Sequence, residues 1–390
     1  MKLIDEIVAD KPLLTEWRRD FHAHPELAYE EHRTSKLVAE RLADFGVEVH
    51  TGYGGTGVVG RLKAGSGNRA IALRADMDAL PMTELNEFGH RSTVQGKMHG
   101  CGHDGHTTML LGAAKHLAAD PRFDGTVYFI FQPAEEGEAG AKRMIDDGLF
   151  EKFPVESVYG MHNWPGMPVG TFAVKPGPMM AAVDTWEMAI IGEGGHAAMP
   201  HQAVDSVVTA AQVINGLQTI ASRNTHPIDS VVLSVTMVHG GDADNVLPER
   251  VVLGGTVRTF REGVRDAVEP AMRRVAGGIC AAMGARFELD YTRLYPATIN
   301  SLEESELAAE AAAAVVGDGN VDLQPVPSMG GEDFAFMLRE RPGSYVWVGN
   351  GPGEGGCMLH NPRYDFNDEV LPVGASYWVE LTRRLLPQAG

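Results

Sequence analysis

The 390-residue chain has few cysteines and no long apolar run, and each shortage excludes a class of protein. Its three cysteines, Cys101, Cys280 and Cys357, are too few and too scattered for a disulfide framework, which favours a reducing compartment. No apolar run approaches the roughly 18 residues that a membrane-spanning helix needs. The N-terminus lacks a basic stretch followed by an apolar one, so we predict no secretory signal and a cytoplasmic location.

Positive charge is also in short supply. The chain has 33 Lys and Arg residues against 52 Asp and Glu residues, so its formal net charge is −19. Proteins that bind nucleic acids or dock on anionic membranes usually present a basic face, so neither partner is expected. Hydrophobic residues make up 44% of the chain and charged residues 22%, which is typical of a globular protein and excludes a disordered one.

Short apolar runs alternate with helical patterns in the first and last parts of the chain. Strands are expected at residues 70–73, 126–131, 157–161 and 344–348. Helices are expected at residues 33–45, 106–119, 139–149 and 303–316. This alternation predicts an α/β domain with a largely parallel, buried central sheet that is flanked by helices.

The middle of the chain has a different order of elements: strand, helix, strand, strand, helix, strand. The strands are expected at residues 185–191, 230–238, 251–259 and 286–291, and the helices at residues 204–221 and 264–283. This β-α-β-β-α-β order is that of the ferredoxin-like unit. We therefore predict a catalytic domain formed by residues 1–183 and 297–390, interrupted by a compact ferredoxin-like lid at residues 184–296.

Residues 52–57, GYGGTG, match the G-x-G-x-x-G pattern of dinucleotide-binding loops. That function requires a strand before the pattern and a helix after it. Here a strand-like run, residues 58–62, follows instead. We therefore predict an ordinary hairpin-type loop rather than a cofactor site.

Residues 98–106, MHGCGHDGH, concentrate potential metal ligands. One cysteine, three histidines and an aspartate occur close together, and thiolate, imidazole and carboxylate are the usual ligands of zinc-like divalent ions. The glycines let the backbone turn sharply, so that alternate side chains can converge. The alternative is a glycine-rich turn with incidental histidines.

Other polar side chains follow predicted strands. Glu135 and Glu136 come after residues 126–131, and open α/β sheets bind ligands at such strand ends. The alternative for this pair is an acidic helix N-terminus. His162 ends another predicted strand, and His360 ends the segment CMLH. For each histidine, the alternative is a structural role.

Asp76 and Asp78 follow the strand predicted at residues 70–73, in positions that suit orienting a ligand histidine or binding a metal directly. In all, five candidate ligands lie at strand ends or in adjoining loops, and this set suits two metals that share ligands. The five are Cys101, His103, Glu136, His162 and His360.

The predicted lid also carries polar residues of interest. His196 and Asn245 lie in glycine-containing interruptions between strands, and Arg258 lies inside a strand pattern. Ordinary loops and a surface arginine are the alternative interpretation.

Seven separated motifs resemble those of the M20 metallopeptidase-type amidohydrolases, and they occur in the same order. The motifs are MHGCGHDGHTTMLLGAA, FQPAEEG, GMHNWPGMPVG, GEGGHAAMPH, NVLPERVVLGGTVRTF, GGEDFAF and HNPRYDFND. The resemblance is to the branch that contains hippurate hydrolase and the plant indoleacetyl-amino-acid hydrolases. It extends from residue 22 to residue 368, with a small departure at Gly100, where that branch commonly has alanine.

The resemblance implies a two-metal catalytic domain with a lid that dimerises, so a homodimer or a higher homo-oligomer is expected. It implies the same five metal ligands, with Glu135 as general acid/base and Asp76 as the aspartate that orients the site. It further implies that His196, Asn245 and Arg258 contact the substrate. His196 is expected to reach the active site of the partner chain.

We therefore predict a metal-dependent amidohydrolase that cleaves small N-acyl-L-amino acids, such as hippurate or N-acetyl amino acids, to a carboxylate and a free amino acid. Arg258 suits the α-carboxylate of such a substrate, because a guanidinium matches a carboxylate. Two divalent ions per subunit are expected, and manganese, zinc, cobalt and nickel all tolerate this ligand set. The alternatives are a dipeptidase or small carboxypeptidase with the same site, and a metal-dependent binding or sensing protein with an inert site.

Overall fold

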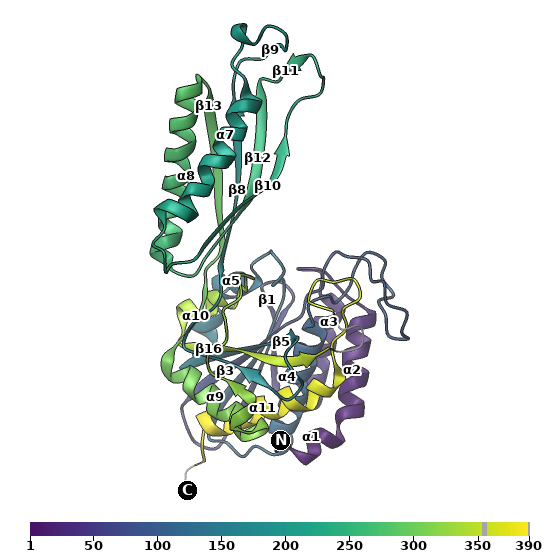
Figure 1. The fold of residues 1–390 in the computed structure, drawn as a ribbon. Helices are drawn as coiled ribbons and strands as arrows, with labels where there is room; N and C mark the ends of the chain where they lie inside the picture. Colours follow the sequence, from purple (N-terminus) through teal and green to yellow (C-terminus); the bar gives the residue numbers. More distant parts are fainter. Residues whose placement is uncertain (353–356, 389–390) are drawn as a thin grey trace. The chain divides into compact units, whose positions relative to one another are not determined.

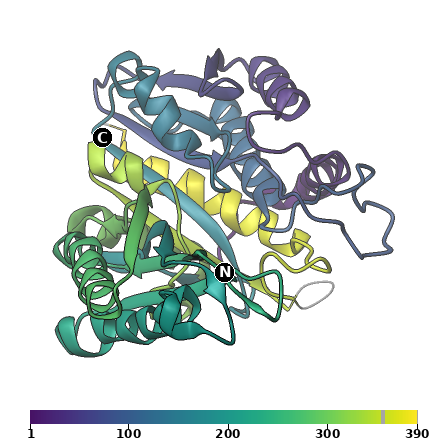
Figure 2. The same ribbon diagram turned by 90° about the horizontal axis from the view of Figure 1, so that it is seen from above.

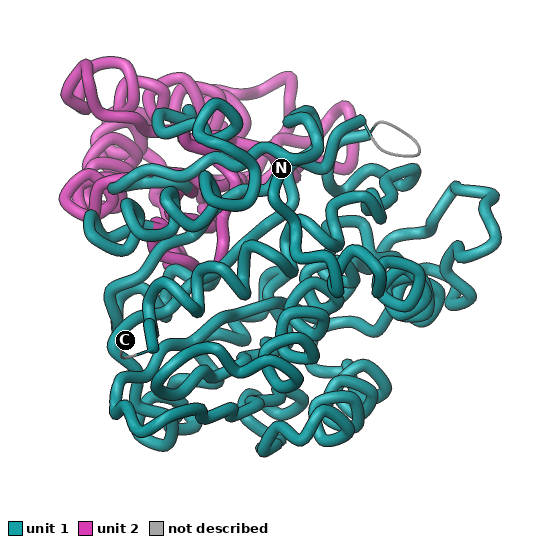
Figure 3. The backbone as a smooth tube through the Cα atoms, turned by 90° about the horizontal axis from the view of Figure 1, so that it is seen from below, with its two compact units in different colours: residues 1–179, 299–326, 333–390 teal, residues 180–298, 327–332 magenta. Residues whose placement is uncertain are grey.

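The computed structural model describes residues 1–352 and 357–388 and divides the chain into two compact units (Figures 1 and 3). Unit 1 contains Met1–Met179, Ile299–Val326 and Asp333–Gly390, and unit 2 contains Met180–Thr298 and Pro327–Glu332. The chain therefore leaves unit 1, forms most of unit 2, and returns to complete unit 1. Within the described residues, no helix combines the length and apolar character needed to cross a membrane.

Unit 1 is built on an eight-stranded sheet with the order β1-β2-β4-β3-β5-β16-β6-β15. Its central pairs β4–β3, β3–β5 and β5–β16 are parallel, as is the edge pair β6–β15. The strands are β1 (Glu48–Tyr53), β2 (Gly57–Ala64), β3 (Ala70–Asp76), β4 (Gly125–Gln132), β5 (Ser157–Pro165), β6 (Phe172–Ala173), β15 (Val321–Asp322) and β16 (Gly343–Gly351). Every residue of β4 and β16 is buried, as expected for a sheet covered on both faces.

Helices flank this sheet. They are α1 (Asp5–Ala9), α2 (Lys11–Ala23), α3 (His32–Asp44), α4 (His103–Ala119), α5 (Gly140–Asp146), α6 (Leu149–Lys152), α9 (Leu302–Val316), α10 (Ala335–Glu340) and α11 (Leu371–Leu385), with short 3-10 helices η3 (Asp318–Asn320) and η4 (Asp368–Val370). Helix α4 is buried along most of its length, because it packs on β3, α2 and α11. The C-terminal segment, yellow in Figure 2, thus lies among the N-terminal elements of unit 1.

Unit 2 is a four-stranded antiparallel sheet with the order β10-β12-β8-β13, covered by two helices. Its elements are β8 (Ala182–Ile191), α7 (Ser206–Thr219), the π-helix η2 (Ile220–Asn224), β10 (Val231–His239), β12 (Arg250–Thr259), α8 (Glu262–Met283) and β13 (Arg286–Tyr295). Smaller elements of unit 2 are the ribbon β9 (Gly195–His196) with β11 (Val246–Leu247), and η1 (Pro200–Gln202). The paired strands β7 (Gly177–Met180) and β14 (Thr298–Asn300) lie where the chain passes from one unit to the other. The predicted fold class, a largely parallel α/β domain with an inserted ferredoxin-like unit, is confirmed.

Several boundaries differ from the sequence prediction. The single helix expected at residues 139–149 is divided into α5 and α6, because Gly148 between them has a left-handed φ of 88°. Strand β5 continues to Pro165, so His162 lies inside the strand rather than after its end. Residues 52–57 form the turn between the antiparallel strands β1 and β2, and the predicted hairpin-type loop is confirmed.

A buried ionic network joins α2 to α4 in unit 1. The Arg18 guanidinium is fully buried, with Nη1 2.8 Å from Asp365 Oδ1 and 3.6 Å from Asp104 Oδ2. On the next turn of α2, His22 Nδ1 lies 2.9 Å from Asp104 Oδ2. Burial alone would lower the pKa of His22, but hydrogen bonds to Asp104 and Glu84 outweigh it and raise the pKa to about 9. The network therefore fastens the first turn of α4.

Removing one member of this network should destabilise unit 1. Arg18→Leu leaves buried carboxylates without their cation, and such a loss typically costs about 3–5 kcal/mol. Arg19→Ala is the matched control, because the partly exposed Arg19 pairs with Asp368, a carboxylate that Arg18 contacts too. Exposed pairs contribute less than about 1 kcal/mol. Urea titration followed by tryptophan fluorescence measures both variants. Equal, small losses of unfolding free energy would show that the Arg18 network contributes little.

Candidate metal centre

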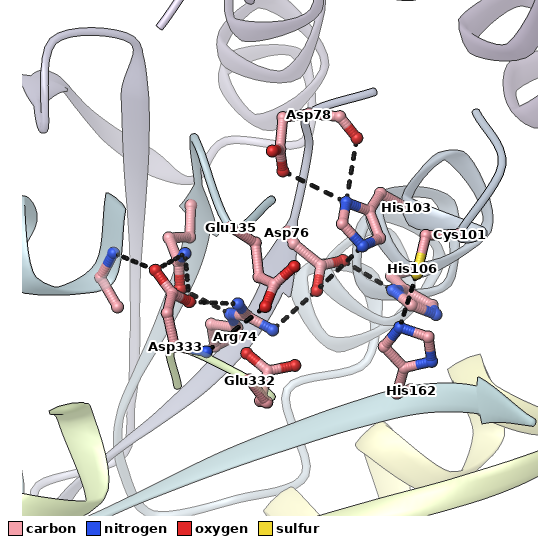
Figure 4. A network of polar contacts seen from close by, with 12 residues as sticks. Arg74, Asp76, Asp78, Cys101, His103, His106, Glu135, His162, Glu332 and Asp333 are labelled. Carbon is pink, nitrogen blue, oxygen red and sulfur yellow. Dashed lines mark hydrogen bonds and ion pairs between the residues drawn. The ribbon is translucent and has the colours of Figure 1, made fainter. Parts of the chain in front are cut away.

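The five predicted ligands come together in unit 1. Cys101 precedes α4, His103 is the first residue of α4, Glu136 follows β4, His162 lies within β5, and His360 lies beyond β16. Cys101 Sγ is 3.3 Å from His162 Nε2, and His360 Nε2 is 3.3 Å from Glu136 Oε1. His103 Nε2 is 3.9 Å from the same Glu136 oxygen. Figure 4 shows Cys101, His103 and His162 pointing toward one another.

These side chains form two overlapping groups. The potential ligand atoms of Cys101, His103 and His162 lie within 4.8 Å of one another, and so do those of Cys101, Glu136 and His360. Cys101 is common to both groups, which is the arrangement that two ions sharing one thiolate require. Among the described residues, His103 Nε2 is buried and makes no hydrogen bond. A buried polar atom without a hydrogen bond is costly, and a metal ion would satisfy it.

The electrostatics of the cluster also favour cations. Burial raises the pKa of the Cys101 thiol well above its usual range, and the neighbouring Glu136 and Glu135 carboxylates raise it further. Burial lowers the pKa of His103, but the Asp76, Asp78 and Glu136 carboxylates outweigh it and raise the pKa to about 10. The carboxylate contributions to both shifts reflect the negative charge around the cluster, which a divalent ion would neutralise.

Asp78 orients the first ligand histidine. His103 Nδ1 is 2.9 Å from the Asp78 carbonyl oxygen and 3.2 Å from Asp78 Oδ1, so this nitrogen carries a proton and donates it. The opposite nitrogen, Nε2, is left facing the cluster. Asp78 Oδ2 also accepts a hydrogen bond of 2.9 Å from the Glu136 backbone N–H. One carboxylate therefore positions two candidate ligands.

Asp76 holds a different histidine, one that the sequence analysis did not select. Asp76 Oδ1 is 2.6 Å from His106 Nδ1, and His106 Nε2 accepts a hydrogen bond of 2.9 Å from the Asn163 backbone N–H. Because Nε2 is thus occupied, His106 positions Asn163, the neighbour of His162, and does not act as a ligand. The contact that orients a ligand histidine comes from Asp78, so the orienting role expected of Asp76 stays a prediction.

Asn163 explains the glycine before α4. Its side-chain Nδ2 donates to the Cys101 carbonyl oxygen at 2.7 Å, and its Oδ1 accepts from the Tyr364 hydroxyl at 2.5 Å. A Cβ atom on Gly102 would lie 2.3 Å from Asn163 Nδ2, and Gly102 has a φ of +94°. Only glycine fits there, and it lets Cys101 and His103 both turn toward the cluster.

Glu135 lies beside the cluster and is 7% exposed. A carboxylate oxygen of Glu135 lies within 4.8 Å of potential ligand atoms of His103 and Glu136. Its Oε1 accepts a hydrogen bond of 3.3 Å from the Asp333 backbone N–H. Asp333 is fixed in turn, because its Oδ1 is 3.1 Å from Nη2 of the buried Arg74, as Figure 4 shows. Sequence reasoning missed Arg74 and Asp333, although Asp333 lies in the GGEDFAF motif.

Comparison with known proteins identifies the family. The model described as Peptidase family M20/M25/M40 matches residues 72–384. The chain belongs to the M20 family. The resemblance found in the sequence is thereby confirmed.

This M20 chain is similar to proteins along its full length. It is 40% identical over 386 residues to a hippurate hydrolase of Campylobacter jejuni, covering 99% of this chain and 100% of that one. It is 41% identical over 380 residues to an N-acetylcysteine deacetylase of Bacillus subtilis, covering 96% and 98%. A crystal structure of a dinuclear metal-binding M20 peptidase from Bacillus subtilis matches with a TM-score of 0.85 and 38% identity, covering 97% and 99%. This dinuclear relative and the two ligand groups support two divalent ions in the M20 chain.

The remaining predicted site residues lie in unit 2. His196 on β9 pairs with Val246 on β11 and is exposed; its Nδ1 accepts a hydrogen bond of 3.1 Å from the Ala198 N–H, which leaves the ring proton on Nε2. Asn245 is also exposed, and its carbonyl oxygen accepts from the Ala197 N–H at 3.0 Å. The site residues of unit 2 therefore include an outward-facing hydrogen-bond donor.

Arg258 lies on β12 and lines a hollow of about 470 Å³ in unit 2, together with Thr256 and Asp290. Its Nη1 donates to Thr256 Oγ1 and, at 3.1 Å, to the Val257 carbonyl oxygen. Burial lowers the pKa of Arg258, although Asp184 opposes that shift. Within the part of the chain that the structure describes, Arg258 has no carboxylate at ion-pair distance. An anionic ligand would supply one.

Cys101→Ser should reduce the metal content of the M20 chain, because a hydroxyl is a poorer ligand than a thiolate. Since both ligand groups contain Cys101, we expect the loss of more than one ion per chain. Cys280→Ser and Cys357→Ser are the matched controls and should retain the wild-type content. Elemental analysis of dialysed protein measures all three. Retention of two ions by Cys101→Ser would contradict the shared ligand.

Proposed function

We propose that this M20 chain is a metal-dependent amidohydrolase that cleaves small N-acyl-L-amino acids to a carboxylate and a free amino acid. The observation that carries the proposal is a buried carboxylate, Glu135, beside two ligand groups that share Cys101. The names of the two curated relatives, a hippurate hydrolase and an N-acetylcysteine deacetylase, support this substrate class.

Two groups of residues would hold the ions. We assign Cys101, His103 and His162 to one ion, and Cys101, Glu136 and His360 to the other. Divalent ions bound there lower the pKa of a water molecule and polarise the carbonyl group of the substrate. Manganese, zinc, cobalt and nickel are all compatible with these nitrogen, oxygen and sulfur donors.

Glu135 is the proposed general acid/base. It accepts the proton of the attacking water and then delivers that proton to the departing amide nitrogen. The Asp333 N–H holds one oxygen of Glu135, so the carboxylate keeps a fixed orientation during both transfers. Asp78 keeps His103 and the Glu136 backbone in place during the same steps.

Substrate contacts are proposed from unit 2. Arg258 would pair with the α-carboxylate, and Asn245 would add a neutral hydrogen bond. His196 of the partner subunit would donate its Nε2–H to the carbonyl oxygen as negative charge develops there. This arrangement requires a homodimer or a higher homo-oligomer formed through unit 2, and it rests on the resemblance to the M20 branch.

Exchanging the two adjacent glutamates for glutamine separates their roles. Glu135→Gln keeps the shape of the side chain but removes the proton acceptor, so we expect full metal content and a fall in kcat of roughly a hundredfold or more. Glu136→Gln should lose metal as well as activity. Elemental analysis and hydrolysis of N-acetyl, N-benzoyl and dipeptide substrates measure both variants. Metal loss in Glu135→Gln but not in Glu136→Gln would mean that the two roles are exchanged. Cleavage of dipeptides alone by the wild-type protein would indicate a dipeptidase.

Arg258→Ala tests recognition of the α-carboxylate. Loss of a charge-assisted hydrogen bond costs about 1.5–3 kcal/mol, so kcat/KM for substrates with a free carboxylate should fall about tenfold to a hundredfold. The amides of the same substrates should be affected much less. Arg250→Ala, on the same strand but in an exposed pair with Glu288, is the control and should leave both substrate types unchanged. An equal loss on acids and amides would contradict the proposed pairing.

A further inference from the structure

Glu31 is a buried carboxylate that the proposed reaction does not use. It lies just before α3 with no exposed surface. Its Oε1 accepts a hydrogen bond of 2.9 Å from the Ala134 backbone N–H, and its Oε2 accepts one of 2.6 Å from the Thr56 hydroxyl. Ala134 directly precedes Glu135, and Thr56 belongs to the β1–β2 turn. One side chain therefore joins three segments that are far apart in the sequence.

The segment that Glu31 contacts is a closed, strained loop. Ala134 and Ala139 both have a left-handed backbone, with φ of 54° and 56°, which residues other than glycine rarely adopt. The Gly140 N–H donates to the Ala134 carbonyl oxygen at 2.9 Å and closes the loop that carries Glu135 and Glu136. Such strain persists only where the surroundings hold it, and it is typical of functional sites.

Three contacts hold this loop from outside. Glu31 accepts a hydrogen bond from the N–H of Ala134. Ala134 is fully buried, so water cannot replace Glu31 as the acceptor. The Tyr29 hydroxyl donates to the Glu138 carbonyl oxygen at 2.8 Å, and Asp333 Oδ2 accepts from the Ala141 N–H at 2.8 Å. The glycine-rich β1–β2 turn also packs closely here, since a Cβ on Gly57 would lie 3.1 Å from Pro133 Cδ.

We infer that Glu31 is a positioning residue, which holds the Ala134–Gly140 loop so that Glu135 faces the metal cluster in the orientation that proton transfer needs. The inference deepens the proposed function and rests on it for the effect on rate. A misplacement of about 1 Å at a reacting group can cost a hundredfold in rate, so the hydrogen bonds of Glu31 affect turnover although the side chain does not touch the substrate.

The shape of Glu31, rather than its charge, should matter. Burial raises the pKa of this carboxyl group to about 7, although the Thr56 hydrogen bond opposes that shift. A glutamine can accept from the Ala134 N–H through its oxygen and donate to the Thr56 hydroxyl through its nitrogen. Glu31→Gln therefore keeps both connections, whereas Glu31→Ala removes both.

The test compares Glu31→Ala, Glu31→Gln and Glu26→Ala for kcat, KM, metal content and urea midpoint, using N-acetyl and N-benzoyl amino acids as substrates. Glu26 is the matched control, because it accepts hydrogen bonds from the Arg33 and Thr34 backbone N–H groups of the same segment without contacting the loop. We expect Glu31→Ala to lose about tenfold to a hundredfold in kcat with KM little changed. Glu31→Gln should recover most of that loss, and Glu26→Ala should keep wild-type kcat even where its stability falls.

Two results would overturn the inference. A wild-type kcat in Glu31→Ala would mean that the loop does not need this contact, and failure of Glu31→Gln to recover activity would mean that charge, not position, is required. If Glu31→Ala does not fold, Thr56→Val replaces it, because this variant removes only one of the two hydrogen bonds of Glu31. Thr56→Val should show a smaller fall in kcat, and an unchanged kcat would contradict the inference. If the metal-loaded wild type cleaves no substrate, the proposed function fails. The metal content then tests the inference separately, because the loop that Glu31 holds also carries Glu136. Glu31→Ala, unlike Glu31→Gln, should then lose the ion held by Glu136.

Discussion

The hydrogen bonds between His103 and Asp78 determine which ring nitrogen of His103 faces the other candidate metal ligands. With Nδ1 donating to Asp78, only Nε2 is available to a metal. The same carboxylate fixes the backbone of Glu136. Asp78 lies two residues after Asp76, the last residue of β3, so this central parallel strand sets the reference position for candidate ligands from α4 and from the loop after β4.

The position of α4 depends on contacts made behind the cluster. Arg18 and His22 on α2 bind Asp104, which is adjacent to His103, and these contacts fasten the start of the helix. Gly102 permits the turn before the helix, and Asn163 occupies the space that a larger residue would need. The candidate site is thus supported by buried polar groups whose interactions are mutually dependent.

Much of the fold and several candidate ligands could be predicted from the sequence, because strand periodicity and the placement of polar residues at strand ends are local signals. The shared motif of Cys101 and His103 predicts that they are ligands, the place of Glu136 after an apolar strand predicts the same for it, and the structure brings all three together. The sequence pattern predicts His162 at a strand end, but β5 continues beyond it because its pairing with β16 holds the polar residues in the sheet. That pairing joins residues far apart in the sequence, and no local pattern reports it.

The supporting residues were harder to predict for the same reason. Nothing near His106 indicates that its partner is the Asn163 N–H, and nothing near Glu31 indicates that it binds Ala134. Asp333 lies in a recognised motif, but its contact with Glu135 exists only after the chain has returned from unit 2. The periodicity of one segment cannot report such long-range hydrogen bonds.

The sharing of Cys101 between two ligand groups also affects how the site responds to oxidants. A thiolate is far more easily oxidised than a thiol, and oxidation to a sulfenic acid would weaken a ligand of both ions at once. Burial and the neighbouring Glu136 and Glu135 carboxylates raise the pKa of the Cys101 thiol, and a raised pKa disfavours the thiolate that oxidants attack. The buried, acidic surroundings of this shared candidate ligand therefore also oppose its oxidation.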